Sequence, residues 1–325
     1  MQIMEWKAGA GFQDDPYRDT EWLSPSTYVW RTNSEILTAV TESFMNKESQ
    51  MMLVVSDYGL GKSAFRHALS ITLSQEAARR RRTFQQMTLL QAEWTELQLY
   101  KEVAVKLSRS DQGDRHSVRR RVEEAIGEKA ERGMELLLTV DDSHYLKPSG
   151  YHALKHISDL EINGRKLCPV LMLGYYKVAE ALKVGDLAQV ADRATLRKQL
   201  NIFTQRDVFE YVARTCEWAK GRPLPQSYQF PAAAAGDTAA AQRVSAEFPK
   251  LLPFSALSVL RIYALTRNPR YVRLLCSEAI KVQAEGSDAL QAPARFTIEP
   301  EIIDQAWERV KFVMQEEGGK PYPGE

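Results

Sequence analysis

The chain has 325 residues, of which 44% are hydrophobic and 26% are charged. This composition is typical of a soluble globular protein with one large domain or two ordinary ones, and it excludes a disordered or fibrous chain. The formal net charge of +1 excludes a protein that attracts nucleic acid through its overall charge. Any contact with nucleic acid must therefore depend on local basic patches.

The cysteines and the N-terminus bear on the cellular compartment. Cys168, Cys216 and Cys276 are scattered and form no C-x-x-C pair, which fits reduced thiols and gives neither a disulfide framework nor a zinc site. The first residues lack the basic and apolar regions of a signal peptide. No window reaches the roughly 18 apolar residues of a membrane helix. We therefore expect a cytoplasmic protein without a membrane partner.

Residues 1–48 begin with an irregular aromatic segment, which we expect to form a strap that packs on the sheet or on a neighbouring molecule. A helix is expected over residues 33–47, and the domain proper over residues 49–203. There, apolar runs typical of buried strands alternate with amphipathic stretches typical of helices. Strands are expected within residues 51–56, 83–94, 134–146, 166–174 and 197–203. This alternation predicts an α/β domain with a five-stranded parallel sheet covered by helices on both faces.

The strand signal ends near residue 204. Helical spacing recurs over residues 204–221, 255–267, 269–286 and 299–318. Residues 222–254 are rich in proline and alanine, and we expect an excursion here, that is, a long irregular connection with at most one helix in its middle. We therefore expect a helical domain over residues 204–317 and a disordered tail over 318–325.

A phosphate-binding loop is predicted between the first strand and the next helix. The sequence "SDYGLGKSA" fits G-x-x-x-x-G-K-[ST] except at its first position, where Ser56 replaces glycine. The two glycines nearest the lysine are present, and backbone N–H groups at such a strand-to-helix turn point at phosphate. Lys62 would reach the outer phosphates of ATP, and the Ser63 hydroxyl would bind Mg²⁺. The nucleotide-binding residues are expected to be Ser56, Asp57, Tyr58, Gly59, Leu60, Gly61, Lys62, Ser63 and Ala64.

Two acids end the apolar run "ELLLTVDD". Asp141 stands where the run ends, the position of a carboxylate that holds Mg²⁺ through water. Asp142 would then polarise the attacking water. The alternative is a capping pair at a strand end, where aspartate is common, but the presence of the phosphate-binding loop favours the metal and base roles.

The chain resembles the ExeA/TnsC/TniB/MuB group of AAA+ ATPases. "DDSHYL" resembles the D-E-A-H-x-L box of that group, "PVLMLGYYKVAEAL" its strand-G-x-x-x-L segment, and "RNPRYVRLLCSEAI" its lid motif. "DPYRDTEWLSPST" and "DRATLRKQLNIFTQRDVFEYVARTCEWAKG" are similar to its entry segment and its lid linker. The match covers most of residues 12–310. The resemblance implies an AAA+ P-loop NTPase fold followed by a helical lid domain.

The resemblance also implies residue roles. Arg270 would reach the γ-phosphate from the lid, and Arg193 and Arg197 would be candidate arginine fingers for a neighbouring subunit, because the planar guanidinium matches phosphate oxygens. Tyr175 and Tyr176 stand where a small polar residue that contacts the nucleotide is usual, and Asp142 stands where a glutamate base is usual. Slow hydrolysis is therefore expected.

Two arginine runs are candidates for contact with the backbone of duplex DNA. The candidate residues are Arg79, Arg80, Arg81, Arg82, Arg119, Arg120 and Arg121. The alternative is that each run is a solvated surface. His152 and His156, spaced i and i+4, fit a helix face better than a metal pair, because no further ligand stands at matching spacing.

The resemblance to the transposition regulators of this group implies a function for this chain. They assemble with ATP and Mg²⁺ on duplex DNA as a homo-oligomer, a ring or a helical filament, and recruit transposase and a target-selection protein. The sequence lacks the membrane helix and the peptidoglycan-binding part of ExeA-like secretion ATPases, which favours transposition. A nucleotide-gated scaffold without hydrolysis is a further alternative.

Overall fold

The computed structural model describes residues 2–17, 31–90, 93–183, 185–224, 253–286 and 297–316. Contacts divide the chain into two compact units. The sheet unit comprises Glu35–Tyr58 and Phe65–Leu200, and the helical unit comprises Met1–Ser34, Gly59–Ala64 and Asn201–Glu325. The phosphate-binding loop therefore groups with the helical unit, although the strand before it belongs to the sheet. The domain boundaries expected from the sequence stay a prediction.

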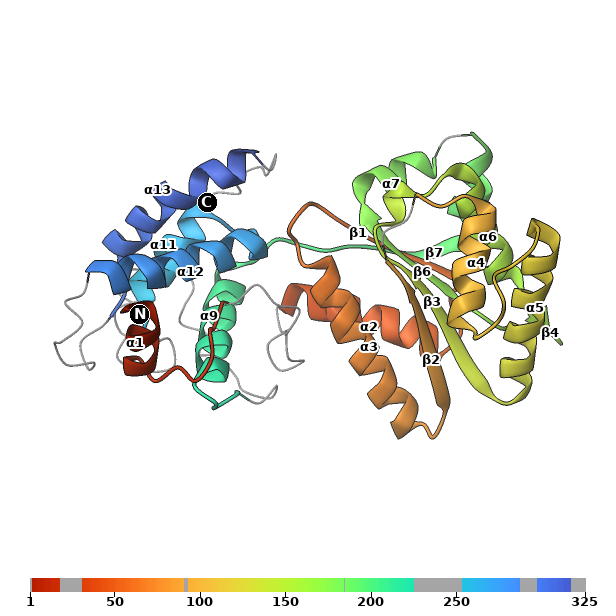
Figure 1. Ribbon diagram of the computed structural model, residues 1–325, viewed down its shortest axis with the longest axis horizontal. Coiled ribbons are helices and arrows are strands. Elements are labelled where there is room, and N and C mark those ends of the chain that lie inside the picture. Colours follow the sequence, from red (N-terminus) through yellow and green to blue (C-terminus); the bar gives the residue numbers. More distant parts are fainter. Residues whose placement is uncertain are drawn as a thin grey trace. The chain divides into compact units, whose positions relative to one another are not determined.

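The sheet unit is built on five parallel strands in the order β2-β3-β6-β1-β7 (Figure 1). The strands are β1 (Met51–Ser56), β2 (Thr83–Leu89), β3 (Met134–Val140), β6 (Val170–Tyr175) and β7 (Ala194–Gln199). Every residue of β1 is buried, as expected for a central strand with helices on both faces. The five-stranded parallel sheet expected from the sequence is confirmed.

Helices cover both faces of this sheet. Figure 1 shows α2 and α3 on the opposite side of the sheet from α4, α5 and α6. The helices are α2 (Arg31–Met45), α3 (Lys62–Arg79), α4 (Glu96–Lys106), α5 (Arg115–Glu131), α6 (Pro148–Asp159), α7 (Tyr176–Ala181) and α8 (Ala188–Arg193). The largest apolar cluster joins the inner faces of α4, α5 and α6 to alternate residues of the strands, such as Leu53, Leu138 and Met172.

Two local features of the sheet unit differ from the expectation. The last strand begins at Ala194, because its pairing with β1 starts at Met51↔Ala194, and it ends at Gln199 instead of running to residue 203. A hairpin of β4 (Glu161–Ile162) and β5 (Arg165–Lys166) precedes β6. Its turn places Asn163 and Gly164 at φ 53° and 76°, the Asn-Gly turn that favours tight hairpins.

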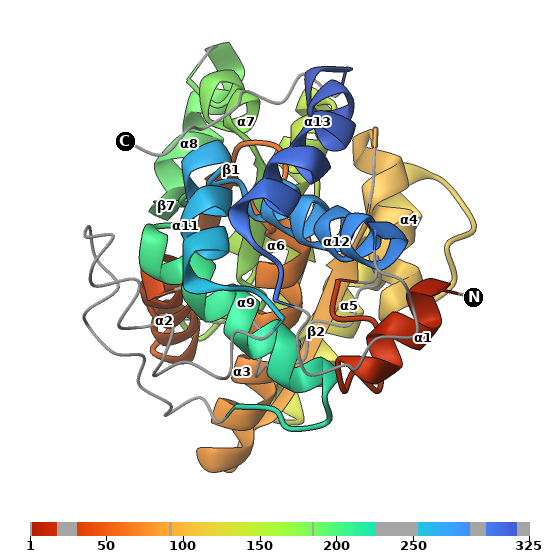
Figure 2. The same ribbon diagram turned by 90° about the vertical axis from the view of Figure 1, so that its left-hand side faces the viewer.

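The helical unit contains α1 (Gln2–Gly9), α9 (Gln205–Ala219), α11 (Ala256–Leu265), α12 (Pro269–Gly286) and α13 (Pro300–Glu316). Figure 2 shows α9, α11, α12 and α13 in one layer, with α1 beside it. The four later helices match the expected helical ranges. The helix α1 was not expected, and the excursion and the tail lie almost wholly outside the described residues.

The described part of the N-terminal segment packs on helices of its own unit. Backbone N–H groups of Gln13 and Asp14 donate to the Ala219 carbonyl at the end of α9, over 2.6 and 3.1 Å. The ring of Tyr17 lies against Tyr211, with centroids 6.2 Å apart. Aromatic and apolar side chains of α9 therefore offer a buried surface to residues 10–17, and packing on the sheet or on a neighbouring molecule stays a prediction. Residues 18–30 lie outside the described part.

Candidate nucleotide-binding site

The carboxyl ends of three neighbouring strands form the site edge of the sheet. Ser56 pairs with Tyr175, so β1 and β6 end at the same level. The strand β3 ends at Val140, opposite Met172 of β6, and Asp141 and Asp142 follow it. The parallel topology therefore brings to one edge the acids and the tyrosine that the sequence singled out. This edge is where ligands bind in open α/β sheets.

The phosphate-binding loop has the backbone that its glycines allow. Gly59 and Gly61 have φ of +77° and +83°, a left-handed region that side chains with a Cβ rarely adopt. The helix α3 begins at Lys62, so its free N–H groups follow the glycines directly. Ser56, the departure from the motif, is fully buried and its hydroxyl donates to the Asp57 carbonyl over 2.9 Å. The hydroxyl is thus satisfied, and the serine is compatible with the loop.

The start of α12 lies against this loop within the helical unit. The Arg270 N–H donates to the Gly59 carbonyl over 3.3 Å and to Asn268 Oδ1 over 3.0 Å. A Cβ on Gly59 would stand 2.7 Å from Asn268 Oδ1 and 3.0 Å from the Arg270 Cβ. The segment "NPR" therefore contacts the phosphate-binding loop through its backbone. The role of the Arg270 side chain at the γ-phosphate stays a prediction.

Asp141 is a buried carboxylate with a cationic neighbour. It is 6% exposed, and its Oδ1 accepts from the Asp142 N–H over 3.0 Å. Its Oδ2 forms an ion pair of 3.1 Å with Nε of Arg66, on α3. Sequence reasoning missed Arg66. Its position three residues after Ser63, one helical turn beyond the loop, was the available signal.

Asp142 occupies a constrained turn. Its φ and ψ are 49° and 38°, a left-handed conformation in which a residue other than glycine stores strain. The next residue, Ser143, is fully buried, donates to the Leu173 carbonyl over 2.9 Å and accepts from the Tyr151 hydroxyl over 2.6 Å. A fixed turn therefore presents Asp142, whose side chain is 31% exposed. Its role as base stays a prediction.

Tyr175 lies in a row of rings along the site edge. Its ring stacks on that of Tyr58, with centroids 6.3 Å apart, and meets His144 edge to face at 4.4 Å. The neighbouring Tyr176 accepts a hydrogen bond from Gln199. Partial burial raises the pKa of Tyr176, with a smaller contribution from the Asp57 carboxylate. Both tyrosines are half-buried.

The two finger candidates lie at the β7 edge of the sheet. Arg193 ends α8, is exposed, and pairs with Asp159 over 3.3 Å. Arg197 lies on β7, and its guanidinium donates to the carbonyls of Ala194 and Ala191 over 3.0 and 2.5 Å. Both arginines lie on a strand edge or beside it and are exposed to solvent. Action on a neighbouring subunit stays a prediction for each.

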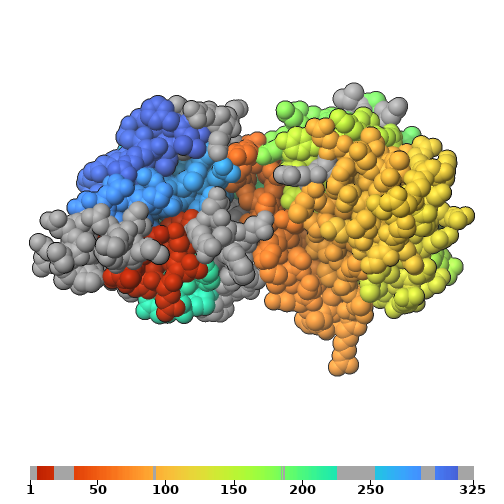
Figure 3. Space-filling model, viewed as in Figure 1, coloured from red at the N-terminus to blue at the C-terminus, as the bar shows by residue number. Residues whose placement is uncertain are grey.

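The first arginine run ends α3, at a corner that projects from the sheet unit (Figure 3). Arg79 and Arg80 both pair with Glu76, each at 2.6 Å. Hydrogen bonds from Arg79, then from Arg80, lower the pKa of Glu76 to about 2. Arg81 is exposed and has φ of 54°. Part of the run is therefore neutralised within the chain.

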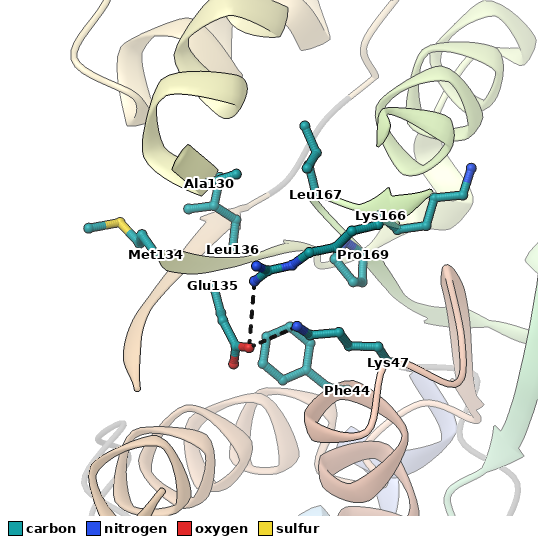
Figure 4. A pocket seen from close by; sticks show the side chains of 10 residues that line it. Phe44, Lys47, Ala130, Met134, Glu135, Leu136, Lys166, Leu167 and Pro169 are labelled. Carbon is teal, nitrogen blue, oxygen red and sulfur yellow. Dashed lines mark ion pairs between the residues drawn. The ribbon is translucent and has the colours of Figure 1, made fainter. Parts of the chain in front are cut away.

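Arg82 pairs with Glu135, which lines a pocket at the opposite, amino-terminal edge of the sheet (Figure 4). The pocket measures about 320 Å³, including its part open to solvent. Its central carboxylate, Glu135, pairs with Lys47 over 3.4 Å, Arg82 over 3.2 Å and Arg165 over 4.0 Å. Contact of Arg82 with DNA would therefore have to replace an existing ion pair.

The second arginine run lies on α5 and is also paired. Arg119 donates to Glu123 over 2.7 Å, and Arg120 pairs with Glu124 over 3.5 Å. Arg121 donates to backbone carbonyls of the loop before α5. Pairs of this i and i+4 kind are weak at a surface. The run remains available to phosphate, and its contact with DNA stays a prediction.

His156 has a structural environment. Its Nδ1 lies 2.8 Å from the Tyr100 hydroxyl, and its Nε2 contacts Arg119 and lies 3.3 Å from Glu123. Burial, and then Arg119, lower the pKa of this histidine. Within the described residues no group of three or more His, Cys, Asp or Glu side chains is placed to hold a metal. The helix-face interpretation of His156 fits this environment.

Comparisons with known proteins bear on the family and the fold. Residues 45–182 match the family model of the AAA domain, and none of the curated proteins matches the chain in sequence. The described residues contain no helix long and apolar enough to span a bilayer.

Solved structures share the fold at low identity. The chain is similar to ORC2 of Aeropyrum pernix in its ADPNP–ADP complexes, with a TM-score of 0.61 and 12% identity over 92% of this chain and 72% of that one. It is similar to Cdc6p of Pyrobaculum aerophilum, with a TM-score of 0.59 and 13% identity over 92% and 72%. It is also similar to Drosophila ORC bound to DNA, with a TM-score of 0.59 and 13% identity over 97% and 68%. The chain therefore has an AAA+ P-loop fold, within which residues 45–182 match the AAA domain.

Proposed function

We propose that this protein is an ATP-dependent regulator of DNA transposition. It assembles on duplex DNA as an ATP-bound oligomer, marks the target, and recruits transposase and a target-selection protein. The observation that carries the proposal is the hydrogen bond from the Arg270 N–H to the Gly59 carbonyl. Because the start of α12 is bonded to the phosphate-binding loop, occupation of the loop by nucleotide acts directly on the helical unit.

ATP binds through the phosphate-binding loop in this proposal. Lys62 neutralises the outer phosphates, and the N–H groups at the start of α3 donate hydrogen bonds to the phosphate oxygens. The hydroxyl of Ser63 and the carboxylate of Asp141 are hard oxygen ligands of the kind that Mg²⁺ prefers. Asp141 is 6% exposed, so a cation at this carboxylate would be poorly screened by solvent. When bound, Mg²⁺ supplies charge neutralisation at the phosphates.

Hydrolysis is slow in this proposal. Asp142 acts as the general base, held by the fixed turn around Ser143, but it is one methylene shorter than glutamate. A base must stand within hydrogen-bond reach of the water that it activates. Tyr175 is engaged by its ring contacts with Tyr58 and His144. Turnover is therefore expected below the roughly 1–100 s⁻¹ of kinases, and ATP serves mainly to hold the assembled state.

Duplex DNA is the client of the assembled state. Drosophila ORC, a structural neighbour, is bound to DNA, and the two arginine runs of this chain supply backbone contacts without base readout. Net charge of +1 gives one subunit little long-range attraction, so useful affinity comes from many subunits aligned on the duplex. Arg193 or Arg197, exposed near the β7 edge, reaches the γ-phosphate of the neighbouring subunit.

Electron microscopy of the purified protein tests this function. We expect rings or filaments with ATP and duplex DNA, and none with ADP. Lys62→Ala is expected to remove the assemblies, whereas Arg222→Ala, at an exposed position away from the loop, leaves them intact. Assemblies that form equally well with ADP, or in the Lys62→Ala variant, would contradict ATP gating. Assembly without DNA that instead binds membranes would favour an ExeA-like secretion role.

A nucleotide-gated scaffold without hydrolysis is the second candidate. The specific observation in its favour is the stacking of Tyr175 between Tyr58 and His144, where a small polar residue would contact the nucleotide. Single-turnover phosphate release distinguishes the two candidates. Slow release that Asp142→Asn abolishes supports the ATPase, whereas no release by the wild type supports the scaffold.

A further inference from the structure

Arg66 lies one turn beyond the phosphate-binding loop on α3, and its guanidinium faces Asp141. Nε of Arg66 is 3.1 Å from Oδ2 of Asp141, and the two side chains are 21% and 8% exposed. The other carboxylate oxygen, Oδ1, already accepts from the Asp142 N–H over 3.0 Å. Both oxygens of this carboxylate are therefore engaged within the chain.

The geometry of Asp141 is fixed by its surroundings. Its own N–H donates to the Leu89 carbonyl of β2 over 2.9 Å, and the following turn is held by the buried Ser143. A Cβ on Gly174 would stand 2.9 Å from Ser143 Oγ, so the turn has little room to shift. Arg66 carries its guanidinium at the end of a long side chain, so this partner of Asp141 can move while the turn stays in place.

A metal ion and Arg66 compete for this carboxylate. A cation at Asp141 would meet a guanidinium charge a few ångströms away, in surroundings where charges are poorly screened. The positive charge of Arg66 disfavours a second positive charge at Asp141, by the same electrostatic repulsion that shifts pKa values. Without a metal, however, the carboxylate is buried, and a buried charge without a partner is strongly unfavourable. Arg66 thus stabilises one state and opposes the other.

We propose that Arg66 is a positioning residue that holds the Asp141 carboxylate in the nucleotide-free chain and yields it when a divalent cation enters with nucleotide. The proposal rests on the function proposed above, because it assigns Asp141 to the metal. Arg66 then sets the affinity of the site for the metal. When the cation enters, the ion pair between Asp141 and Arg66 breaks, and the Arg66 side chain on α3 is released. Binding at the start of α3 is in this way coupled to the side chains further along the same helix.

The nucleotide-free protein tests the first half of this proposal. Arg66→Gln should lower the urea midpoint of unfolding, because the buried Asp141 loses the 3.1 Å ion pair with Arg66. Adding Asp141→Asn to Arg66→Gln should restore part of the midpoint. Arg80→Gln is the matched control, since Arg80 directly follows the last residue of α3 and pairs with a carboxylate, Glu76. An Arg66→Gln midpoint equal to that of Arg80→Gln would overturn the proposal.

Binding of Mn²⁺ with ADP, followed by electron paramagnetic resonance, tests the second half. Mn²⁺ shares the oxygen ligands of Mg²⁺ and gives a direct count of bound metal. Arg66→Gln should bind Mn²⁺·ADP about tenfold more tightly than wild type, an effect of the size produced by one neighbouring charge. Arg66→Lys, which keeps the charge, should stay close to wild type.

The outcomes separate this proposal from the proposed function. Wild-type protein that binds Mn²⁺·ADP, together with an Arg66→Gln variant that binds it equally or more weakly, would overturn the role of Arg66 alone. Wild-type protein that binds no Mn²⁺·ADP would overturn the nucleotide function and this proposal together.

Discussion

Gly59 allows the contact between α12 and the phosphate-binding loop to be tested by substitution. Gly59→Ala places a Cβ on a residue with φ of +77°, 2.7 Å from Asn268 Oδ1. The left-handed backbone costs an alanine about 1–2 kcal/mol. Displacement of Asn268, which is 2% exposed and accepts from the Arg270 N–H, removes a helix cap worth about 1 kcal/mol. We expect a total loss of about 2–3 kcal/mol in the free energy of unfolding.

Gly133→Ala is the matched control for this change. Gly133 has the same φ of +77°, but nothing stands within 4 Å of its added Cβ. Gly133→Ala should therefore lower the free energy of unfolding only by the cost of the left-handed backbone, about 1–2 kcal/mol. Both variants are compared by urea unfolding followed by circular dichroism. Introducing Asn268→Ala beside Gly59→Ala should reduce the Gly59→Ala penalty to that of Gly133→Ala. Equal losses for the two single variants would refute the close approach of Asn268.

Three further predictions concern buried groups. Arg214→Met should lower the free energy of unfolding by about 3–5 kcal/mol, because Arg214 and Glu210 form a 3.0 Å ion pair with side chains 1% and 4% exposed. Loss of a surface ion pair changes this free energy by about 1 kcal/mol at most. Urea unfolding measures the difference, and a loss of about 1 kcal/mol or less would contradict a stabilising buried pair. The pKa of His156 is lowered from 6.5 in the folded chain, so the unfolded chain binds the proton first and stability falls as the pH drops through about 6.5. His156→Gln should flatten this part of the pH profile of the unfolding midpoint. An unchanged profile would contradict a lowered pKa for His156. The three cysteines are buried, and burial raises the pKa of Cys168 and of Cys216 to about 12. Mass spectrometry should therefore find all three unmodified by iodoacetamide in the native protein and modified after unfolding.

Local patterns made much of the site predictable. The loop from Ser56 to Ser63 and the acids after β3 are each defined by a few consecutive residues beside an apolar run, so spacing alone located them. The parallel sheet followed from alternation along the chain, because βαβ units admit few arrangements. The hairpin before β6 also had a readable signal, since Asn163-Gly164 is a strong turn pair.

Partners distant in sequence were not predictable. Arg66 meets Asp141 only because α3 packs on the sheet beside β3, and the contact of Asn268 with Gly59 joins segments far apart along the chain. The arginine runs read as free cations, yet Glu76 and Glu135 neutralise part of the first run. Such pairing depends on where separate elements come together, and one sequence carries no local pattern for it.

The central claim is that ATP gates binding to duplex DNA. Fluorescence anisotropy of a labelled duplex, titrated with protein in the presence of ADP or a non-hydrolysable ATP analogue, tests it most directly. We expect binding only with the analogue, without strong sequence preference, and with an affinity that falls steeply with salt, by a slope of about −0.9 for each phosphate neutralised. Lys62→Ala should abolish binding, and replacement of Arg79, Arg80, Arg81 and Arg82 by alanine should flatten the slope. Binding that is equal with ADP and with the analogue, or no binding at low salt with the analogue, would contradict the account.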